Sequence, residues 1–432
     1  MKARISVQRP AQSYRSTAKE KTVRGYTIAS DLPSPEPGPV STSQVVFVRL
    51  VAAAVNVAPP LVGSYALGRE SYGMVASVLA IATIAYGPVS QVLSQSLLRL
   101  LCTEQEAERA VGAALLFCIG CIALAALLCF TGAIAPADAL QLGTLVVSLT
   151  LLRICEVQLI SAERVVPSIL VFYAAPPALS SLFYLVAGAA GGGPEAGAVA
   201  QALAYCVAAV LAMMTAHGVT SLIVQALRRP AGAAGGELAR SMSLMVSGAA
   251  AAAADYLPVV LLRGLGAFSA IPVYEIARKI ASVPTTFANP LLNQMSPAII
   301  RAYASENRHE IRRLLRRFFQ LLFYAAIAFL CFVGATLVAG SYIPRIEDVA
   351  ELLVPLSLGT LVAMWCVPYQ SLLIAARRDR WFTVSSGISV ALLLALTHLC
   401  AGLGPGLAVS WAVGCSVAVS GLILRYRAMK EA

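Results

Sequence analysis

The sequence contains few charged residues. Only 12% of its 432 residues are Asp, Glu, Lys or Arg, whereas a soluble domain carries about 25%. Hydrophobic residues make up 59% of the chain, and the mean hydropathy is +0.78. This composition excludes a water-soluble globular protein and predicts an integral membrane protein.

The sequence also lacks the patterns on which most enzymes and metal sites depend. It has no glycine-rich phosphate loop, no nucleophile elbow and no histidine pair at metal-binding spacing. Its three histidines are far apart in the chain. Cys118 and Cys121 lie in the apolar run FCIGCIALAALLCF without a second cysteine pair, which favours packing of small side chains over a zinc site. We therefore expect no enzyme activity, no cofactor and no metal.

Apolar runs long enough to cross a membrane recur along the whole chain, since one spanning helix needs roughly 20 apolar residues. They predict an all-α, polytopic protein with twelve transmembrane helices and no cleaved signal peptide. The predicted spans are residues 44–66, 72–98, 110–134, 139–162, 167–190, 196–226, 241–264, 268–299, 316–340, 350–375, 381–402 and 405–424.

Two polar segments define the expected domain organisation. Residues 1–43 are rich in basic residues, Ser and Pro, which predicts a disordered cytoplasmic tail. Residues 229–240, RPAGAAGGELAR, are polar and glycine-rich and lie midway along the chain. They predict a cytoplasmic linker between an N-terminal six-helix lobe at 44–228 and a C-terminal one at 241–427, with a cytoplasmic end at 428–432.

The distribution of Lys and Arg predicts the orientation, because cytoplasmic segments carry an excess of both. With twelve spans and a cytoplasmic N-terminus, 25 of the 32 Lys and Arg residues fall in inside segments. Both termini are therefore expected to be cytoplasmic. The same bias accounts for the net charge of +11 through topology and attraction to anionic membrane lipids, so we exclude nucleic acid as a partner.

A few charged residues fall within the predicted spans. Such residues are costly in a bilayer, and they usually face the bundle interior and mark a functional pathway. Glu275, Arg278 and Lys279, in PVYEIARKIASVPT, are three and four residues apart and so share one helical face. An internal ion pair would still leave one positive charge over, which favours a cavity lining over a purely structural role.

Four further charges allow different interpretations. Arg49 lies a few residues from the cytoplasmic end of the first span, where it could line a cavity or extend to the interface. Arg153 and Glu156 are three residues apart, a spacing that favours a structural ion pair. Asp255 has no cation within one helical turn. It is a candidate proton or cation site, or a partner for a charge on another helix.

Four stretches carry a family resemblance. In YALGRESYGMVAS, within 65–100, an LG and a short polar loop are followed by YG. Within 255–315 an Asp, an LG, the pattern Y-x-x-A-x-K and a Pro before a basic loop occur in that order. SLLIAARRDRWFTVSSGISVALLLAL at 371–396 and GLGPGLAVSW at 402–411 follow. This order resembles bacterial polysaccharide exporters, the lipid-linked oligosaccharide flippases of the multidrug/oligosaccharidyl-lipid/polysaccharide (MOP) exporter superfamily.

The resemblance implies two six-helix lobes arranged as a V around a central cationic cavity. It implies that Arg49, Arg278 and Lys279 bind the diphosphate of a polyprenyl-linked oligosaccharide. It further implies a flippase of the bacterial cytoplasmic (inner) membrane that serves surface or exopolysaccharide synthesis, with a polysaccharide polymerase or export machinery as partner. The supporting or ion-coupling candidates are Asp255, Glu275, Arg153 and Glu156.

Two alternative functions remain open. A drug/cation antiporter of the same superfamily would need an acidic cavity, and the first span carries Arg49 and no acid. A polysaccharide polymerase or ligase would need a large external loop with catalytic residues. The predicted topology has no loop of that length, so this second alternative is less favoured than the first.

Overall fold

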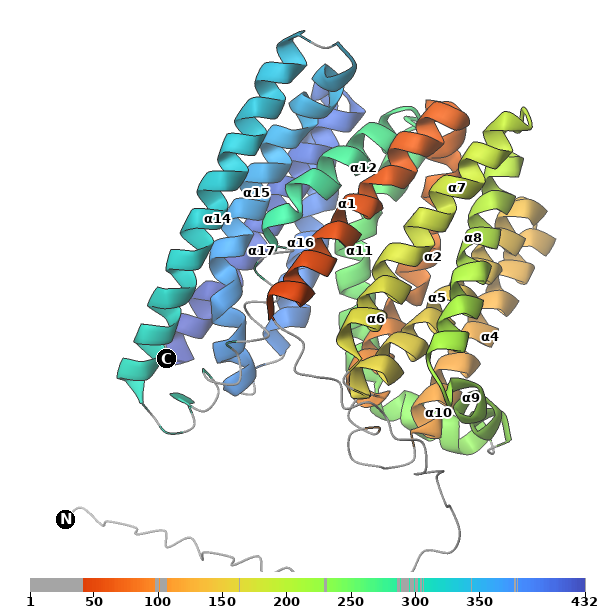
Figure 1. Cartoon of the computed structure of the whole chain (residues 1–432), viewed down its shortest axis with the longest axis horizontal. Helices are drawn as coiled ribbons and strands as arrows, with labels where there is room; N and C mark the ends of the chain where they lie inside the picture. Colours follow the sequence, from red (N-terminus) through yellow and green to blue (C-terminus); the bar gives the residue numbers. More distant parts are fainter. Residues whose placement is uncertain are drawn as a thin grey trace, which may run out of the picture. The chain divides into compact units, whose positions relative to one another are not determined.

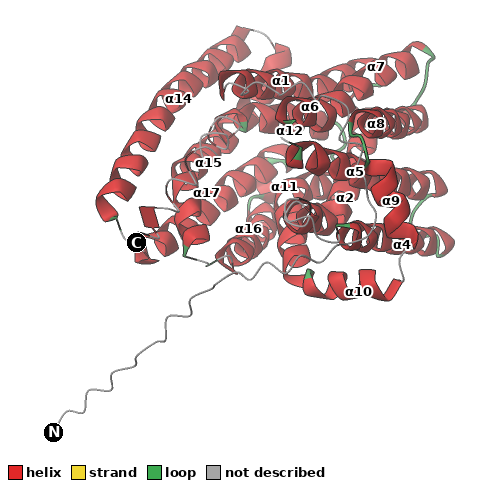
Figure 2. Cartoon of the chain, turned by 60° about the horizontal axis from the view of Figure 1, so that its bottom comes forward, coloured by secondary structure: helices red, strands yellow, loops and turns green. Residues whose placement is uncertain are grey.

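The computed structural model describes residues 42–97, 101, 107–162, 164–228, 231–285, 307–342, 344–376, 378 and 380–431, together with 288, 295, 299, 302, 303 and 305. These residues form helices and the turns between them, without a strand in the described ranges (Figure 2). The predicted all-helical class is therefore confirmed. Nearly all of the predicted tail, residues 1–41, lies outside the described residues.

The N-terminal half contains helices that pack into one bundle. Pro136 and Pro194 occupy the first position of two of them, where the fixed φ of proline suits a helix and its missing N–H costs nothing. The elements are α1 (Thr42–Ala66), α2 (Arg69–Gln91), the π-helix η1 (Val92–Leu97), α4 (Glu108–Phe130), α5 (Pro136–Ser161), α6 (Val165–Ile169), the π-helix η2 (Leu170–Ala174), α7 (Ala175–Ala189), α8 (Pro194–Thr215) and α9 (Val219–Arg228).

The C-terminal half forms a second bundle, in which α15, α16 and α17 make the most extensive contacts. Its elements are α11 (Met242–Gly264), α12 (Ala270–Ala281), α14 (Arg308–Tyr342), α15 (Pro344–Ala375), α16 (Arg380–Leu399), the 3₁₀ helix η3 (Ala401–Leu403) and α17 (Pro405–Glu431). The predicted cytoplasmic end at 428–432 is thus helical as far as Glu431.

Among the described residues, eleven helices are long and apolar enough to cross a membrane. The predicted eighth span, 268–299, is not one of them, because α12 ends at Ala281 and most residues after 285 lie outside the described part. The predicted sixth span, 196–226, is too long. Its helix ends at Thr215, and Gly218, with φ of 89°, turns the chain into the separate helix α9.

The segment predicted as a linker is also helical. Residues Ala231–Arg240 form α10, which packs against α4. Alanine and glutamate in AGAAGGELAR sustain a helix, although the glycines on which the linker prediction rested disfavour one. The contact with α4 supplies the packing that the local sequence does not reveal.

The two bundles meet along α2 and α11, and along α1 and α12 (Figure 1). Glycine makes the first contact possible: a Cβ atom on Gly248 would lie 2.4 Å from the carbonyl oxygen of Gly87. Small residues at such crossings let two helix backbones approach closely, which is how helices gain packing energy inside a membrane. The two-lobe arrangement expected from the sequence is confirmed.

Among the described residues, two ion pairs also join the bundles. Arg69, the first residue of α2, pairs with Asp348 of α15 at 2.9 Å. Arg263, near the end of α11, pairs with Asp138 of α5 at 3.2 Å and donates a hydrogen bond to Ser77 Oγ at 2.9 Å. All four charged residues lie near helix ends, and the sequence-based topology places these ends on the outer face.

Candidate functional site

A cavity of about 370 Å³ lies where the two bundles meet. The N-terminal bundle contributes α1, the segment from α6 to η2, and α8 to its walls, and the C-terminal bundle contributes α11 and α12. Arg49, Arg278 and Lys279, the three cations predicted to bind a diphosphate, all line it. Residues that are more than 200 positions apart in the sequence therefore share one site.

Arg278 reaches from α12 toward α11. Its Nη1 donates a hydrogen bond to the carbonyl oxygen of Asp255 at 2.9 Å, and its guanidinium lies 5.0 Å from the centre of the Tyr256 ring. Its Nε is buried without a hydrogen-bond partner among the described residues. No ion pair within 4 Å joins this guanidinium to the Asp255 carboxylate. The contact between the two residues is therefore made through the backbone carbonyl of Asp255.

Lys279 reaches the opposite way, from the C-terminal bundle to α1 of the N-terminal bundle. Its Nζ donates a hydrogen bond to the carbonyl oxygen of Asn56. The Nδ2 of Asn56 in turn donates to the carbonyl oxygen of Tyr173 at 2.9 Å. A continuous line of hydrogen bonds therefore crosses from α12 through α1 to η2.

Two prolines explain why these carbonyl oxygens can accept side-chain hydrogen bonds. In an α-helix the carbonyl of residue i accepts from the N–H of residue i+4, and proline has no N–H. Pro60 stands four residues after Asn56, and Pro177 stands four residues after Tyr173. Both carbonyls therefore lack the α-helical donor, which makes them available to Lys279 and to the Asn56 amide.

Glu275 does not pair with its neighbours on the shared helical face. It is buried, and its Oε2 accepts a hydrogen bond of 2.7 Å from the hydroxyl of Tyr72 on α2. Although all three side chains are described, no ion pair joins Glu275 to Arg278 or Lys279 within 4 Å. The internal ion pair that the spacing allowed is therefore absent. The sequence suggested that one cation of this helix would remain unpaired, whereas both Arg278 and Lys279 line the cavity without an ion pair to Glu275.

Arg49 lines the cavity from α1, and its Nε is buried without a hydrogen-bond partner among the described residues. Of the two interpretations that the sequence left open, the structure thus favours a cavity position over an extension to the membrane interface. Asn56 also lines the cavity.

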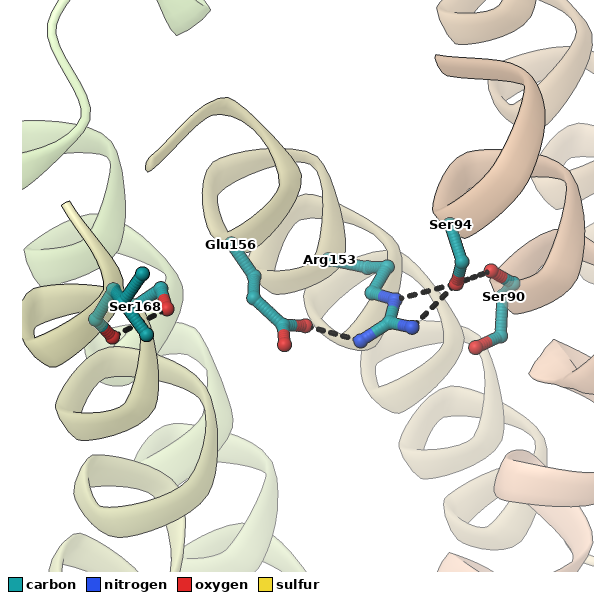
Figure 3. Close-up of polar contacts among 6 residues, drawn as sticks. Ser90, Ser94, Arg153, Glu156 and Ser168 are labelled. Atoms are coloured by element: carbon teal, nitrogen blue, oxygen red, sulfur yellow. Dashed lines mark hydrogen bonds and ion pairs between the residues drawn. The ribbon is translucent and has the colours of Figure 1, made fainter. Parts of the chain in front are cut away.

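Arg153 and Glu156 form the predicted ion pair close to this cavity, inside the N-terminal bundle (Figure 3). Glu156 is buried, and Arg153 also donates to Ser94 Oγ from Nε at 3.0 Å and from Nη2. The guanidinium lies 5.3 Å from the centre of the Phe172 ring. Arg153 is thus held on three sides, which supports a structural role for the pair.

The two π-helices meet at this ion pair. The first, η1, carries Ser94, and the second, η2, carries Phe172 and Tyr173. A π-helical turn contains one extra residue, which rotates the following side chains relative to an α-helix, and such turns are frequent at functional sites. The sequence shows no periodic signal for them. One local feature that accompanies η2 is the proline pair Pro176 and Pro177, which begins two residues after η2 ends.

Sequence reasoning missed the aromatic part of the cavity. Tyr173, Tyr205 and Tyr256 line it, and each comes from a different helical segment. Tyrosine in an apolar helix is equally common at lipid interfaces and in packed cores, so nothing in the sequence singles these three out.

Comparison with known proteins identifies the fold. No protein-family model matches the chain, and no curated protein matches its sequence. A multidrug-resistance MATE family transporter of the MOP superfamily, in its inward-facing conformation, superposes with a TM-score of 0.65 at 14% identity, over 89% of this chain and 98% of that one. An outward-facing structure of such a transporter gives 0.57 at 14% identity, over 90% and 96%.

A third structure, the Vibrio cholerae MATE transporter VcmN in the bent form, gives a TM-score of 0.54 at 12% identity, over 90% of this chain and 97% of that one. The chain therefore has the fold of MATE transporters of the MOP superfamily. This fold agrees with the one that the sequence resemblance implies, and the assignment to the polysaccharide exporters stays a prediction.

Proposed function

We propose that the protein is a flippase that moves a polyprenyl-diphosphate-linked oligosaccharide from the cytoplasmic to the outer leaflet of the inner membrane. The observation that carries the proposal is the charge of the central cavity. Among the described residues, three cations, Arg49, Arg278 and Lys279, line it together with one carboxylate. That carboxylate, Glu275, accepts a hydrogen bond from Tyr72. A cavity of net positive charge suits an anionic headgroup.

Diphosphate chemistry fits the donors that the cavity presents. A guanidinium can donate to two phosphate oxygens at once, and both cavity arginines retain an Nε without a partner among the described residues. Asn56 and the tyrosines of the cavity wall supply polar and aromatic surface for sugars. The lipid tail would remain in the bilayer, and a polysaccharide polymerase or export machinery would take the flipped product.

Transport would proceed by rocking of the two bundles about this cavity. The inter-bundle ion pairs Arg69–Asp348 and Arg263–Asp138 lie on the face that the sequence-based topology places outside. The chain also superposes with a higher TM-score on the inward-facing transporter than on the outward-facing one. We therefore infer an inward-facing state, in which opening to the outside requires both ion pairs to separate.

A second candidate function is a drug/cation antiporter. The likeness to multidrug-resistance MATE transporters favours it, and so do the tyrosines of the cavity wall, since aromatic faces attract organic cations. The buried carboxylates near the cavity, Glu275 and Glu156, would then serve ion coupling, with Asp255 as a further candidate. The cations that line the cavity oppose this function.

One reconstitution experiment separates the two candidates. Purified protein in liposomes is expected to move a fluorescent polyprenyl-diphosphate-linked oligosaccharide between leaflets, measured as the labelled lipid that becomes accessible to an external glycosidase. The same liposomes should not accumulate ethidium under a proton or sodium gradient. Protein-free liposomes provide the background rate. Ethidium accumulation without lipid movement would replace the flippase proposal with the antiporter.

The proline pair of α1 provides a second, matched prediction. Pro60→Ala restores an N–H donor to the carbonyl of Asn56, where it competes with Lys279 Nζ. Pro59→Ala restores a donor to the carbonyl of Val55, which accepts no side-chain hydrogen bond from a described residue of the cavity. Loss of one hydrogen bond is expected to lower the transport rate roughly two- to tenfold in Pro60→Ala and little in Pro59→Ala. Equal losses in the two variants would show that Pro60 acts only through helix geometry.

A further inference from the structure

A cluster of cations and aromatic rings lies at the C-terminal end of α17, away from the central cavity. Arg425, Arg427 and Lys430 come from the last turns of α17, and Arg380 and Trp381 begin α16, which packs against it. Figure 1 shows this end of α17, marked C, beside the first turns of α14. We call this group the C-terminal basic cluster.

The cluster rests on a packed base. Leu424 and Ala428, in the same turns of α17, are 5% and 0% exposed and pack against Leu372 and Leu373 of α15. Tyr426, on the opposite face of these turns, is 52% exposed. The two arginines flank the packed stripe, Arg425 on the side of Tyr369 and Arg427 on the side of Trp381.

Aromatic rings lie against the cations of the cluster. The guanidinium of Arg427 lies 3.7 Å from the centre of the Trp381 ring. Arg425 lies 5.7 Å from Tyr369, and Lys430 lies 4.7 Å from Tyr426. A guanidinium stacked on a ring keeps the N–H groups at its edge free to donate, so the two arginines can donate to an acceptor beyond the described residues.

The positive charge of the cluster is not neutralised within the described part of the chain. Arg425, Arg427 and Lys430 have no carboxylate within ion-pair distance among the described residues, whereas Arg313, at the same end of the C-terminal bundle, pairs with Glu310 at 3.0 Å. The candidate span of α17 ends at Lys430, so the cluster lies where a membrane helix reaches the headgroups. Trp and Tyr at this depth are typical of the membrane interface.

We infer that the C-terminal basic cluster is a binding site for the phosphate of an anionic phospholipid in the adjacent leaflet. The arginine edges would donate to the phosphate oxygens, and the exposed ring of Tyr426 and the side chain of Met429 would contact the glycerol and the first acyl carbons. A zwitterionic lipid has the same phosphate, but its headgroup also carries a positive charge that the cluster would repel. The site should therefore prefer a lipid with net negative charge. This inference is independent of what the central cavity transports.

Native mass spectrometry of the full-length protein, titrated with phosphatidylglycerol or phosphatidylcholine in detergent, tests the site. Wild type is expected to retain phosphatidylglycerol more tightly. Arg425→Gln with Arg427→Gln should weaken that binding roughly tenfold or more, since each charge-assisted hydrogen bond to a phosphate oxygen contributes at least about that factor. Trp381→Leu should weaken it as well, although it changes no charge, because Arg427 then loses the ring that orients it.

The matched control is Arg316→Gln with Arg317→Gln. These two arginines are exposed on the first turns of α14 and have no aromatic ring beneath them among the described cation–ring contacts. The control removes the same charge and should change phosphatidylglycerol binding little. Equal losses in the two double variants would reduce the effect to diffuse surface charge, and equal wild-type binding of both lipids would eliminate the site. If Trp381→Leu fails to fold, the comparison of the Arg425/Arg427 double variant with the Arg316/Arg317 double variant still tests the site.

Discussion

Under the proposed flippase function, replacing Arg278 with Gln is expected to lower the rate of lipid-linked oligosaccharide transport roughly ten- to a hundredfold, while the protein still inserts into the membrane. The reason is the loss of charge-assisted hydrogen bonds to the diphosphate, each worth about 1.5 to 3 kcal/mol. Lys279→Gln should act in the same direction. Arg278→Lys should also reduce transport, because lysine retains the charge but not the two-pronged geometry of the guanidinium.

The control for this prediction is the double variant Glu275→Gln with Arg278→Gln. If the two residues served only to neutralise each other, removing both would restore transport. Glu275 instead accepts a hydrogen bond from Tyr72, and Arg278 donates to the carbonyl of Asp255, so we expect no restoration. Transport would be measured in liposomes that contain equal amounts of each variant. Recovery of the wild-type rate in the double variant would overturn the assignment of Arg278 to the substrate.

Replacing Glu156 with Gln is expected to destabilise the protein by about 3 to 5 kcal/mol, because it leaves the charge of Arg153 without its partner inside the N-terminal bundle. The side chains of Arg153 and Glu156 are only 18% and 4% exposed, so water cannot replace the lost carboxylate. The Glu156 carboxylate also attracts the charge of Arg49, and the Glu156→Gln variant would lose this attraction as well. The measurement is the midpoint of thermal unfolding in detergent, followed by tryptophan fluorescence.

The double variant Arg153→Gln with Glu156→Gln should recover most of this loss, because no charge then remains unpaired. The exposed pair Arg313–Glu310 provides the comparison: its arginine is 78% exposed, and exposed pairs contribute at most about 1 kcal/mol. Arg313→Gln should therefore shift the unfolding midpoint little. A Glu156→Gln protein as stable as wild type would indicate that Arg153 has other sufficient partners, such as Ser94 and the Phe172 ring.

The sequence alone determined the helical membrane class, the division into two halves and the charged residues worth testing. Hydropathy predicts the helical membrane class because a lipid environment requires long apolar helices whose backbone groups are hydrogen-bonded within the helix. The same local reasoning predicted the ion pair of Arg153 with Glu156, since residues three apart on a helix are neighbours whatever surrounds them. It does not show contacts made from elsewhere in the fold, such as the packing of the helix at 231–240 on α4.

Only the tertiary structure decided how the charges are partnered. Glu275 shares a helical face with Arg278 and Lys279, yet its hydrogen bond comes from Tyr72, about 200 residues away in the chain. Arg49 meets the cations of α12 only because the two bundles close around one cavity. The prolines are visible in the sequence, but a freed carbonyl acquires a role only when the fold brings a donor such as Lys279 to it. Helix formation depends on neighbours in sequence, whereas the charge of a cavity depends on neighbours in space.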